Sequence, residues 1–397
     1  MAALIYGELK KIFLKRSTVV VVVLILLLTA LGIINLNYKY IFSFGNNYQE
    51  ICRKYGGQLT EEKENELRNF ADTRKDSMDY GVLLRGYILQ QLERIEDREK
   101  YVNYYREQGK ELEQYGLDIN DKQIINKGKF IQTLYKDEGK PIFTNDLEYE
   151  CILWLGVLYL LVLLGVIFLV GNSFSLESTY NMSEILNATR NGRTKLRCAK
   201  ILAAFCSVLI LNIIFFGSLI LMLKGFGYGL QNLYAPLYLL RNFEKAASSM
   251  TIGRFFMYAI IAQIVLSLVW ATFMMFFSKI TNSYITSMVL GMLCIFGGSY
   301  FEIGYYLRYI GLSPDIRGLE GYSLQEMAFM KYEKAFNPLS YLNPAYYFEK
   351  VRYGEMGGNL VKIYYFPMIV SIGIIIILGS YLILSGNNIC NRRRKRR

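Results

Sequence analysis

The sequence contains no histidine and only six cysteines among its 397 residues. The cysteines stand singly, without a CxxC pair or metal-ligand spacing, and the chain has no GxxxxGK[ST] phosphate-binding loop. Histidine-based catalysis and histidine-ligated metals are therefore excluded. We expect no catalytic residue, no metal site and no ATP site within this chain.

Charged side chains are missing from six stretches, each longer than the roughly 18–20 apolar residues that cross a bilayer. These stretches are residues 17–38, 151–176, 201–223, 255–278, 280–301 and 363–391. They predict an all-α membrane protein with six transmembrane helices, and very apolar core helices of a soluble protein are the alternative. The first stretch exceeds a signal-peptide core of about 7–15 residues, so we expect it to be retained.

Polar segments alternate with these spans. The expected spans are 17–38, 150–172, 199–223, 253–278, 284–301 and 362–386. The expected segments around them are 1–16, 39–149, 173–198, 224–252, 279–283, 302–361 and 387–397. The first of these segments predicts an amphipathic helix lying in the membrane interface, with Leu4, Leu9 and Ile12 on its apolar face and Lys10 and Lys11 opposing them.

The charge distribution predicts the orientation. Residues 1–16, 171–200, Lys279 and 392–397 together carry a net charge of +13, whereas the segments on the other side sum to −1. The positive-inside rule places both termini in the cytoplasm of a multi-pass protein of the cell membrane. The terminal NRRRKRR sequence is more typical of an anchor facing membrane lipid than of a nucleic-acid site.

Residues 39–149 then form an extracytoplasmic domain, for which the sequence predicts two or three packed amphipathic helices. Apolar side chains recur at helical spacing between Leu83 and Tyr105, and Thr60 has the character of a helix start. Glu96 and Lys100 are spaced for a favourable ion pair. Near the last span, Asn-Pro pairs at 337 and 343 predict turns, and the NPAYYFEK stretch favours an aromatic belt at the headgroup level.

The 173–198 segment leaves the membrane and returns after a short polar stretch. Met182, Ile185 and Leu186 can share one small apolar face, and Asn191-Gly192 then breaks the helix. The spans carry no ionisable residue in their interior, which argues against an ion-coupled transporter but not against a permease driven from outside the membrane. Such a permease needs a cytoplasmic element that a motor protein can push.

At these residues the chain resembles the permease subunits of ABC-2-type ABC transporters. The family pattern is matched by Glu177, Ile185-Leu186, Gly192-Arg193 and Lys200, whereas Asn181 stands where Gly is usual. Arg190 likewise stands where Pro is common. The large domain between the first two spans looks like the branch of bacterial export permeases that includes sodium and peptide exporters.

This resemblance implies two permeases working with two ABC ATPase subunits. The second permease would be another copy or a paralogue, and the partner ATPase would bind ATP and Mg. The permease would then be no enzyme, and its substrate is left open among peptide, lipid, drug and ion. The residues implied to couple to the ATPase are Glu177, Met182, Glu184, Ile185, Leu186, Arg190 and Arg193.

Glycines gather in and after the fifth span. Small residues let helix backbones approach closely in lipid, so this set is a candidate for the substrate path or for the seam between two permeases. Packing within one subunit is the alternative. The set consists of Gly291, Gly297, Gly298 and Gly304.

Two other classes of function are carried as alternatives. A membrane-anchored sensor or scaffold would use the extracytoplasmic domain to bind a ligand. A polytopic membrane enzyme would need outer acids such as Glu302, Asp315 and Glu320. We expect no nucleic-acid partner under any of these hypotheses.

Overall fold

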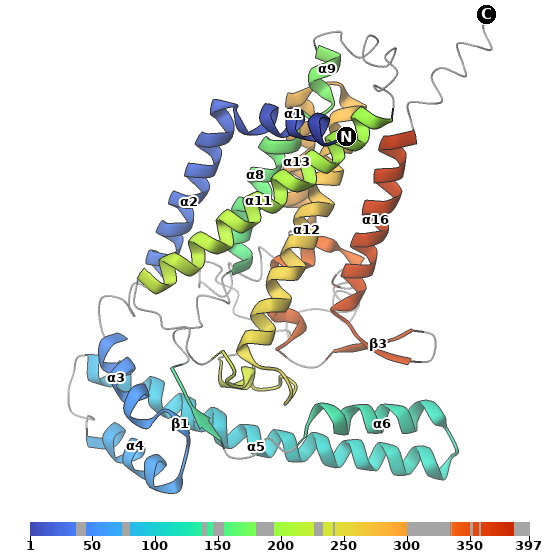
Figure 1. The fold of residues 1–397 in the computed structure, drawn as a ribbon. Helices are drawn as coiled ribbons and strands as arrows, with labels where there is room; N and C mark the ends of the chain where they lie inside the picture. The colour runs from blue at the N-terminus through green and yellow to red at the C-terminus, as the bar shows by residue number, and fades with distance from the viewer. Residues whose placement is uncertain are drawn as a thin grey trace, which may run out of the picture.

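The structure, a computed structural model, is mostly helical. It describes residues 1–36, 45–73, 80–136, 141–145, 155–179, 194–225, 233–240, 243–299, 334, 336–349, 352–356 and 359–384. A bundle of long apolar helices forms one part, and a helical domain lies at one end of it (Figure 1). The bundle contains α1 (Ala2–Phe13), α2 (Arg16–Leu36), α8 (Leu155–Val170), α9 (Ser175–Thr179), α11 (Lys195–Gly225), α12 (Ile252–Thr281), α13 (Tyr284–Gly298) and α16 (Tyr365–Leu384).

Five stretches are long and apolar enough to cross a membrane. They are Arg16–Asn35, Leu158–Glu177, Lys195–Gly225, Ile252–Thr281 and Tyr365–Leu384. These correspond to five of the six predicted spans and indicate a multi-pass membrane protein. The remaining predicted span, 284–301, contains α13, which has 15 residues. At about 1.5 Å per residue it is roughly 22 Å long, shorter than a hydrocarbon core of about 30 Å.

The helices run up and down between two ends of the bundle. The start of α2 and the end of α16 lie at the same end, with α1 lying across it (Figure 1). At this end α12 turns directly into α13 through Asn282, whose positive φ of 52° closes the helix, and Ser283, which caps α13. The helix α13 then returns toward the domain end, where the Asn337 amide donates to the Gly298 carbonyl at 2.7 Å.

The helix α8 lies at the centre of the bundle and is the most buried of the five spans, whereas α16 and α2 are the least buried. It packs closely on α2 because two glycines meet the neighbouring helix. A Cβ atom at Gly165 would lie 2.6 Å from Ile25 Cδ1, and one at Gly32 would lie 2.6 Å from Leu158 Cδ2. Close backbone approach of this kind replaces the hydrophobic driving force that is missing in lipid.

The domain at the other end contains four helices in the described residues. They are α3 (Gly45–Tyr55), α4 (Glu61–Thr73), α5 (Tyr80–Asp118) and α6 (Lys122–Leu134). The strands β1 (Gly57–Gln58) and β2 (Ile142–Phe143) pair antiparallel, so they join the beginning of the domain to its end. Within the domain the Gln91 amide accepts a hydrogen bond from the Tyr48 hydroxyl and donates to the Thr144 carbonyl, at 3.2 and 2.8 Å.

The helices α5 and α6 form a hairpin that extends sideways below the bundle (Figure 1). Asn120 turns the chain with a positive φ of 54°, and the Asp121 carboxylate accepts from the backbone N–H groups of Gln123 and Ile124. The two helices are in close contact, since a Cβ atom at Gly128 would lie 2.6 Å from the Gly109 carbonyl oxygen. The predicted set of two or three helices is therefore too small.

Of two local predictions for this domain, the helix start at Thr60 is confirmed and the ion pair of Glu96 is not. The helix α4 begins directly after Thr60, whose hydroxyl accepts from the Lys63 N–H, as the sequence predicts. The predicted pair of Glu96 with Lys100 is wrong. Glu96 instead pairs with Arg68 of α4, and Lys100 pairs with Asp97 at 3.3 Å. A guanidinium from the neighbouring helix takes the carboxylate that helical spacing had assigned to Lys100.

A buried arginine fastens the domain to the bundle. Arg98 of α5 is 2% exposed, and its guanidinium donates to the Glu244 carbonyl at 2.8 Å and to the Ser248 hydroxyl at 3.3 Å. The same group lies over the Tyr135 and Tyr238 rings, 5.6 and 4.9 Å from their centroids. The loop formed by residues 243–251 leads directly into α12, so the domain is attached at the start of that helix.

Two short 3-10 helices, η4 (Pro338–Leu342) and η5 (Pro344–Tyr347), follow the two Asn-Pro pairs. Asn337 and Asn343 cap these helices, and a proline occupies the first turn of each. The two Asn-Pro pairs, which the sequence predicts as turns, therefore begin short 3-10 helices. The helix η4 packs against α8, α12 and α16. Tyr347 and Phe348 are buried, and Phe348 packs on the rings of Phe255 and Tyr364, so these two face protein and do not form an aromatic belt.

Candidate functional site

The turn that ends α8 is held by hydroxyl groups from two other helices. The Ser278 hydroxyl of α12 accepts hydrogen bonds from the backbone N–H groups of Phe174 and Ser175, at 3.2 and 2.9 Å. The Ser287 hydroxyl of α13 donates to the Gly171 carbonyl at 2.9 Å. The chain that leaves α8 is thus fixed to both α12 and α13 before α9 begins.

A buried ion pair then joins α9 to α11. The Lys200 ammonium lies 2.5 Å from the Glu177 carboxylate and also donates to the Ser173 carbonyl at 2.8 Å. The Lys200 side chain is only 4% exposed, whereas that of Glu177 is 24% exposed. A charge buried this deeply requires a partner, so the ion pair holds α9 in one position relative to α11.

Two further cations surround the same place. The Phe174 ring lies between Lys200 and Lys279, with ammonium-to-centroid distances of 5.0 and 5.9 Å. Arg197 donates to the Ile383 carbonyl at 3.4 Å, and Lys279 donates to the Leu382 carbonyl at 3.3 Å. Cations placed at the last carbonyl groups of a helix stabilise its end, here that of α16.

We call this arrangement the basic junction, and define it by Phe174, Glu177, Arg197, Lys200 and Lys279. It joins the end of α8, the start of α11, the end of α12 and the end of α16. All four elements meet at the end of the bundle that α1 crosses (Figure 1). A displacement applied to α9 would therefore reach four helices at once.

The N-terminal helix packs beside the basic junction. The helix α1 is in contact with α11 and α2, and it buries Ile12 while exposing Tyr6, Lys10 and Lys11. The Thr18 hydroxyl donates to the Ile12 carbonyl at 2.7 Å, which fixes the corner between α1 and α2. Burial lowers the pKa of Lys15 at this corner, and the Glu8 carboxylate partly offsets that effect. The predicted amphipathic helix at the N-terminus is confirmed as a helix.

Of the predicted coupling residues, Glu177 lies in the basic junction. The other six lie outside the described residues; they are Met182, Glu184, Ile185, Leu186, Arg190 and Arg193. The sequence pattern named both Glu177 and Lys200, but not their contact. It missed Phe174 and Arg197, for which the one available signal was the cluster of basic residues at the ends of the spans.

A second group of polar side chains lies inside the bundle, between α8, α11 and α12. The Tyr159 hydroxyl contacts the Asn212 side-chain oxygen and the Gln263 carbonyl, both at 2.5 Å. The Asn212 amide donates to the Ser267 hydroxyl at 3.0 Å. All four residues are at most 1% exposed. In an apolar environment such a network positions the helices, because Tyr159, Asn212 and Ser267 satisfy one another's hydrogen bonds.

One member of this network is incompletely satisfied. Among the described residues, the side-chain amide of Gln263 has no hydrogen-bond partner at either its oxygen or its nitrogen, and the Trp270 indole N–H on the same helix has none either. This network was not predicted from the sequence, because an inspection of the spans limited to Asp, Glu, Lys and Arg passes over Tyr, Asn and Gln.

The predicted glycine set occupies different environments. Gly291 is buried against α12, where an added Cβ would lie 2.5 Å from Met274 Sδ, and Gly298 faces Leu339 of η4 at 2.6 Å. Gly297 faces open space, with no atom within 4 Å of the added Cβ. Gly304 lies outside the described residues. Packing within the subunit thus accounts for Gly291 and Gly298 but not for Gly297.

Metal binding has no candidate in the part of the chain that the structure describes, where no group of three or more Cys, Asp or Glu side chains comes together. The fold and the polar groups define a mostly helical, multi-pass membrane protein with a helical domain at one end. Comparison with protein-family models, curated proteins and solved structures gave no match. Functional assignment therefore rests on the residues themselves.

Proposed function

We propose that this chain is the membrane permease subunit of an ATP-driven ABC exporter of the ABC-2 type. In this proposal six spans cross the membrane, both termini are cytoplasmic, and α13 serves as the short fifth span. The domain formed by α3 to α6 is extracytoplasmic. A separate ATPase binds ATP and Mg and performs the hydrolysis, so that the permease itself is no enzyme.

The observation that carries the proposal is the ion pair between Glu177 and Lys200. A motor outside the membrane can move a permease only through an element that is rigidly fixed to several spans. The ion pair fixes α9 to α11 at 2.5 Å, and the hydroxyl of Ser278 fixes the preceding turn to α12. The basic junction thus has the property that a coupling element needs, at the end where net positive charge favours the cytoplasm.

The helix α12 supports the same proposal by its length and its contacts. It has 30 residues, roughly 45 Å, and carries Ser278 and Lys279 at one end. At its other end it continues from the 243–251 loop, to which Arg98 fastens the domain. Movement at the basic junction would reach the domain through this single helix, which is how ATP hydrolysis on one side would change access on the other.

The test is purification of the tagged full-length chain from the membranes of its own cells in mild detergent. We expect a protein with a GxxxxGK[ST] loop to co-purify and the complex to hydrolyse ATP, whereas the chain alone does not. Recovery of a stable, folded chain without any such partner would contradict the proposal and favour the sensor or scaffold hypothesis.

A second measurement tests the coupling role. Addition of ATP to the complex should change amide hydrogen exchange at the start of α11, residues 195–200, in the wild-type protein. The Glu177→Gln variant should keep its ATPase bound but show a smaller change there. An identical ATP response in the variant would remove Glu177 from the coupling path.

A further inference from the structure

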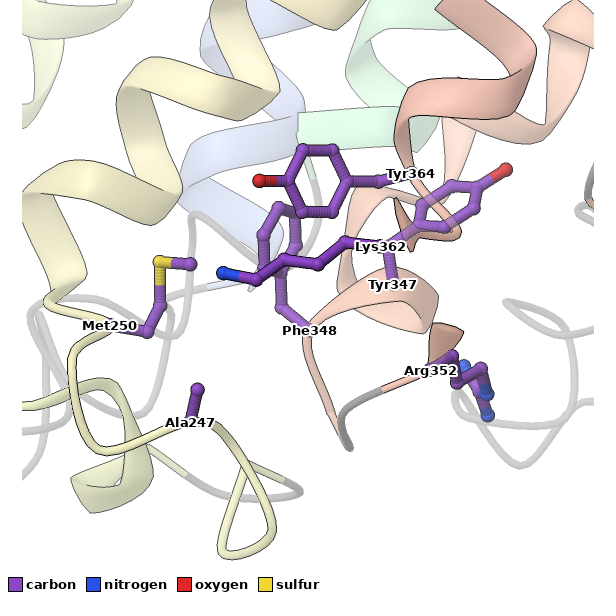
Figure 2. A pocket seen from close by; sticks show the side chains of 7 residues that line it. All are labelled: Ala247, Met250, Tyr347, Phe348, Arg352, Lys362 and Tyr364. Atoms are coloured by element: carbon purple, nitrogen blue, oxygen red, sulfur yellow. The ribbon is translucent and has the colours of Figure 1, made fainter. Parts of the chain in front are cut away.

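A pocket opens at the end of the bundle opposite the basic junction. Residues from four segments line it, namely the 243–251 loop, η5 with the residues after it, strand β4 (Asn359–Lys362) and the residue that precedes α16. The lining residues are Ala247, Met250, Tyr347, Phe348, Arg352, Lys362 and Tyr364. The pocket is a half-open hollow at the protein surface and not an enclosed cavity. Figure 2 shows the Lys362 side chain extending past Phe348 and Tyr364 toward Met250.

The walls of this pocket are aromatic and positively charged. The Phe348 and Tyr364 rings stack with centroids 5.1 Å apart, and Tyr258 stacks on Phe348 at 5.8 Å. The lining contains two basic residues and no acidic one. Neither Lys362 nor Arg352 forms an ion pair with an acidic side chain among the described residues.

The two cations are held differently. Arg352 lies 3.5 Å above the centroid of the Tyr346 ring and donates to the Tyr346 carbonyl, so its position is fixed. Lys362 is half-buried and is the last residue of strand β4, where its backbone pairs with that of Tyr353. A half-buried ammonium beside aromatic walls attracts an anion, since the pocket itself supplies no negative charge.

The position of the pocket along the bundle indicates which kind of anion it binds. Met250 stands two residues before α12, and Tyr364 immediately precedes α16, so the pocket lies where two spans begin. Basic side chains at the ends of spans lie close to anionic lipid headgroups. Between the pocket and the basic junction, α16 exposes Ile369, Ile372 and Ile376, an apolar surface suited to acyl chains.

We propose that this pocket binds the phosphate headgroup of an anionic phospholipid in the leaflet at the domain end of the bundle. The Lys362 ammonium contacts the phosphate, Arg352 adds a second positive charge, and the buried rings of Phe348 and Tyr364 form the wall along which the Lys362 side chain extends. The bound lipid bridges the 243–251 loop, the hairpin that β3 (Tyr353–Met356) forms with β4, and the start of α16. This inference is independent of the ATPase and of the direction of transport.

The test measures phospholipid bound to the purified full-length chain by native mass spectrometry after titration with phosphatidylglycerol or phosphatidylcholine. We expect the wild-type chain to prefer phosphatidylglycerol and Lys362→Gln to bind it roughly fivefold more weakly, with a similar loss for Arg352→Gln. Lys362→Arg should retain the affinity. The matched control is Lys245→Gln, which removes an exposed charge at the same end, outside the pocket.

Three outcomes would overturn the proposal. The first is equal affinity of the wild-type chain for the two lipids, and the second is unchanged phosphatidylglycerol binding by a Lys362→Gln variant that melts like the wild type. The third is complete displacement of the lipid by inorganic phosphate or by a soluble acidic peptide at matched charge, which would assign the pocket to a free anion or to a peptide. Failure of this test leaves the proposed permease function untouched.

Discussion

Lys200, which is almost fully buried, holds the carboxylate of Glu177 at 2.5 Å, and this ion pair links α9 directly to α11. We predict that Glu177→Gln lowers the free energy of unfolding by about 1–3 kcal/mol, because a buried ammonium loses its counter-charge. Thermal melting in detergent would measure the effect.

The matched control for this prediction is Asp97→Asn. Asp97 pairs with Lys100, and their side chains are 68% and 77% exposed, so the loss should be at most about 1 kcal/mol. The double variant Glu177→Gln with Lys200→Met should regain stability, since it removes both charges. If Glu177→Gln melted at the wild-type temperature, the ion pair would have no part in holding the junction together.

The polar network inside the bundle predicts opposite results for two similar substitutions. Gln263→Leu should be neutral or stabilising, because the amide it removes is buried without a partner. Asn212→Leu should destabilise by about 1–2 kcal/mol, because it removes the acceptor of the Tyr159 hydroxyl and the donor to the Ser267 hydroxyl. Chemical or thermal unfolding in detergent distinguishes the two. A larger loss for Gln263→Leu would indicate that the amide has a partner, such as a bound water.

The attachment of the domain depends on Arg98. Arg98→Met should keep the aliphatic packing but lose the donors to Glu244 and Ser248, weakening the attachment by about 1–3 kcal/mol. Amide hydrogen exchange in the 243–251 loop should become faster, while exchange within α12 changes little. Arg106→Met serves as the control, because Arg106 donates to the Asn103 side chain on the surface of the same helix. Unchanged exchange in Arg98→Met would show that other contacts carry the attachment.

Two glycines of α13 predict different consequences of the same substitution. Gly291→Leu should destabilise by about 1–3 kcal/mol, because the new side chain overlaps Met274. Gly297→Leu should leave melting unchanged, since that position is open, but should weaken association with a second permease copy. Analytical ultracentrifugation in detergent would measure the association. A Gly297→Leu chain that associates normally would exclude this position from the seam.

Orientation is testable with single cysteines in a cysteine-free background. Lys110→Cys on α5 should react with a membrane-impermeant thiol reagent in intact cells, whereas Lys10→Cys on α1 should react only after permeabilisation. Both lysines are exposed, so accessibility is matched. The charge imbalance between the two sides motivates this expectation. The reverse labelling pattern would invert the proposed topology.

Much of the membrane region could be predicted from sequence because bilayer thickness constrains composition directly. The charge-free stretches correspond closely to α2, α11, α12 and α16. The helix α13 is shorter than predicted because a contact from a distant part of the chain marks its end. Its apolar stretch continues beyond Gly298, but the Asn337 amide takes the Gly298 carbonyl and marks the end of the helix. A contact that spans 39 residues leaves no trace in local hydrophobicity.

The contacts between elements were less predictable. Spacing within one helix assigned Glu96 to Lys100, but a guanidinium has five donors and Arg68 approaches from α4. Composition assigned Tyr347 and Phe348 to the headgroup layer, whereas two capped 3-10 helices carry them into the protein. In the candidate site, the resemblance named Glu177 and Lys200 as separate pattern members. Their ion pair depends on how the turn after α8 folds, which the pattern does not encode.

The short length of α13 has a consequence for the surrounding lipid. Its exposed side carries an apolar stripe of Ile285, Val289, Leu293 and Phe296, so it presents a hydrophobic wall roughly 22 Å high. The neighbouring α12 is about twice as long. In the proposed topology, in which α13 crosses the membrane, a bilayer that adapts to both helices is thinner on the α13 side, at a cost of fractions of a kcal/mol per Å of mismatch. Lipids with short acyl chains should therefore gather beside α13, and membranes of different thickness should tune the tilt and the activity of this protein.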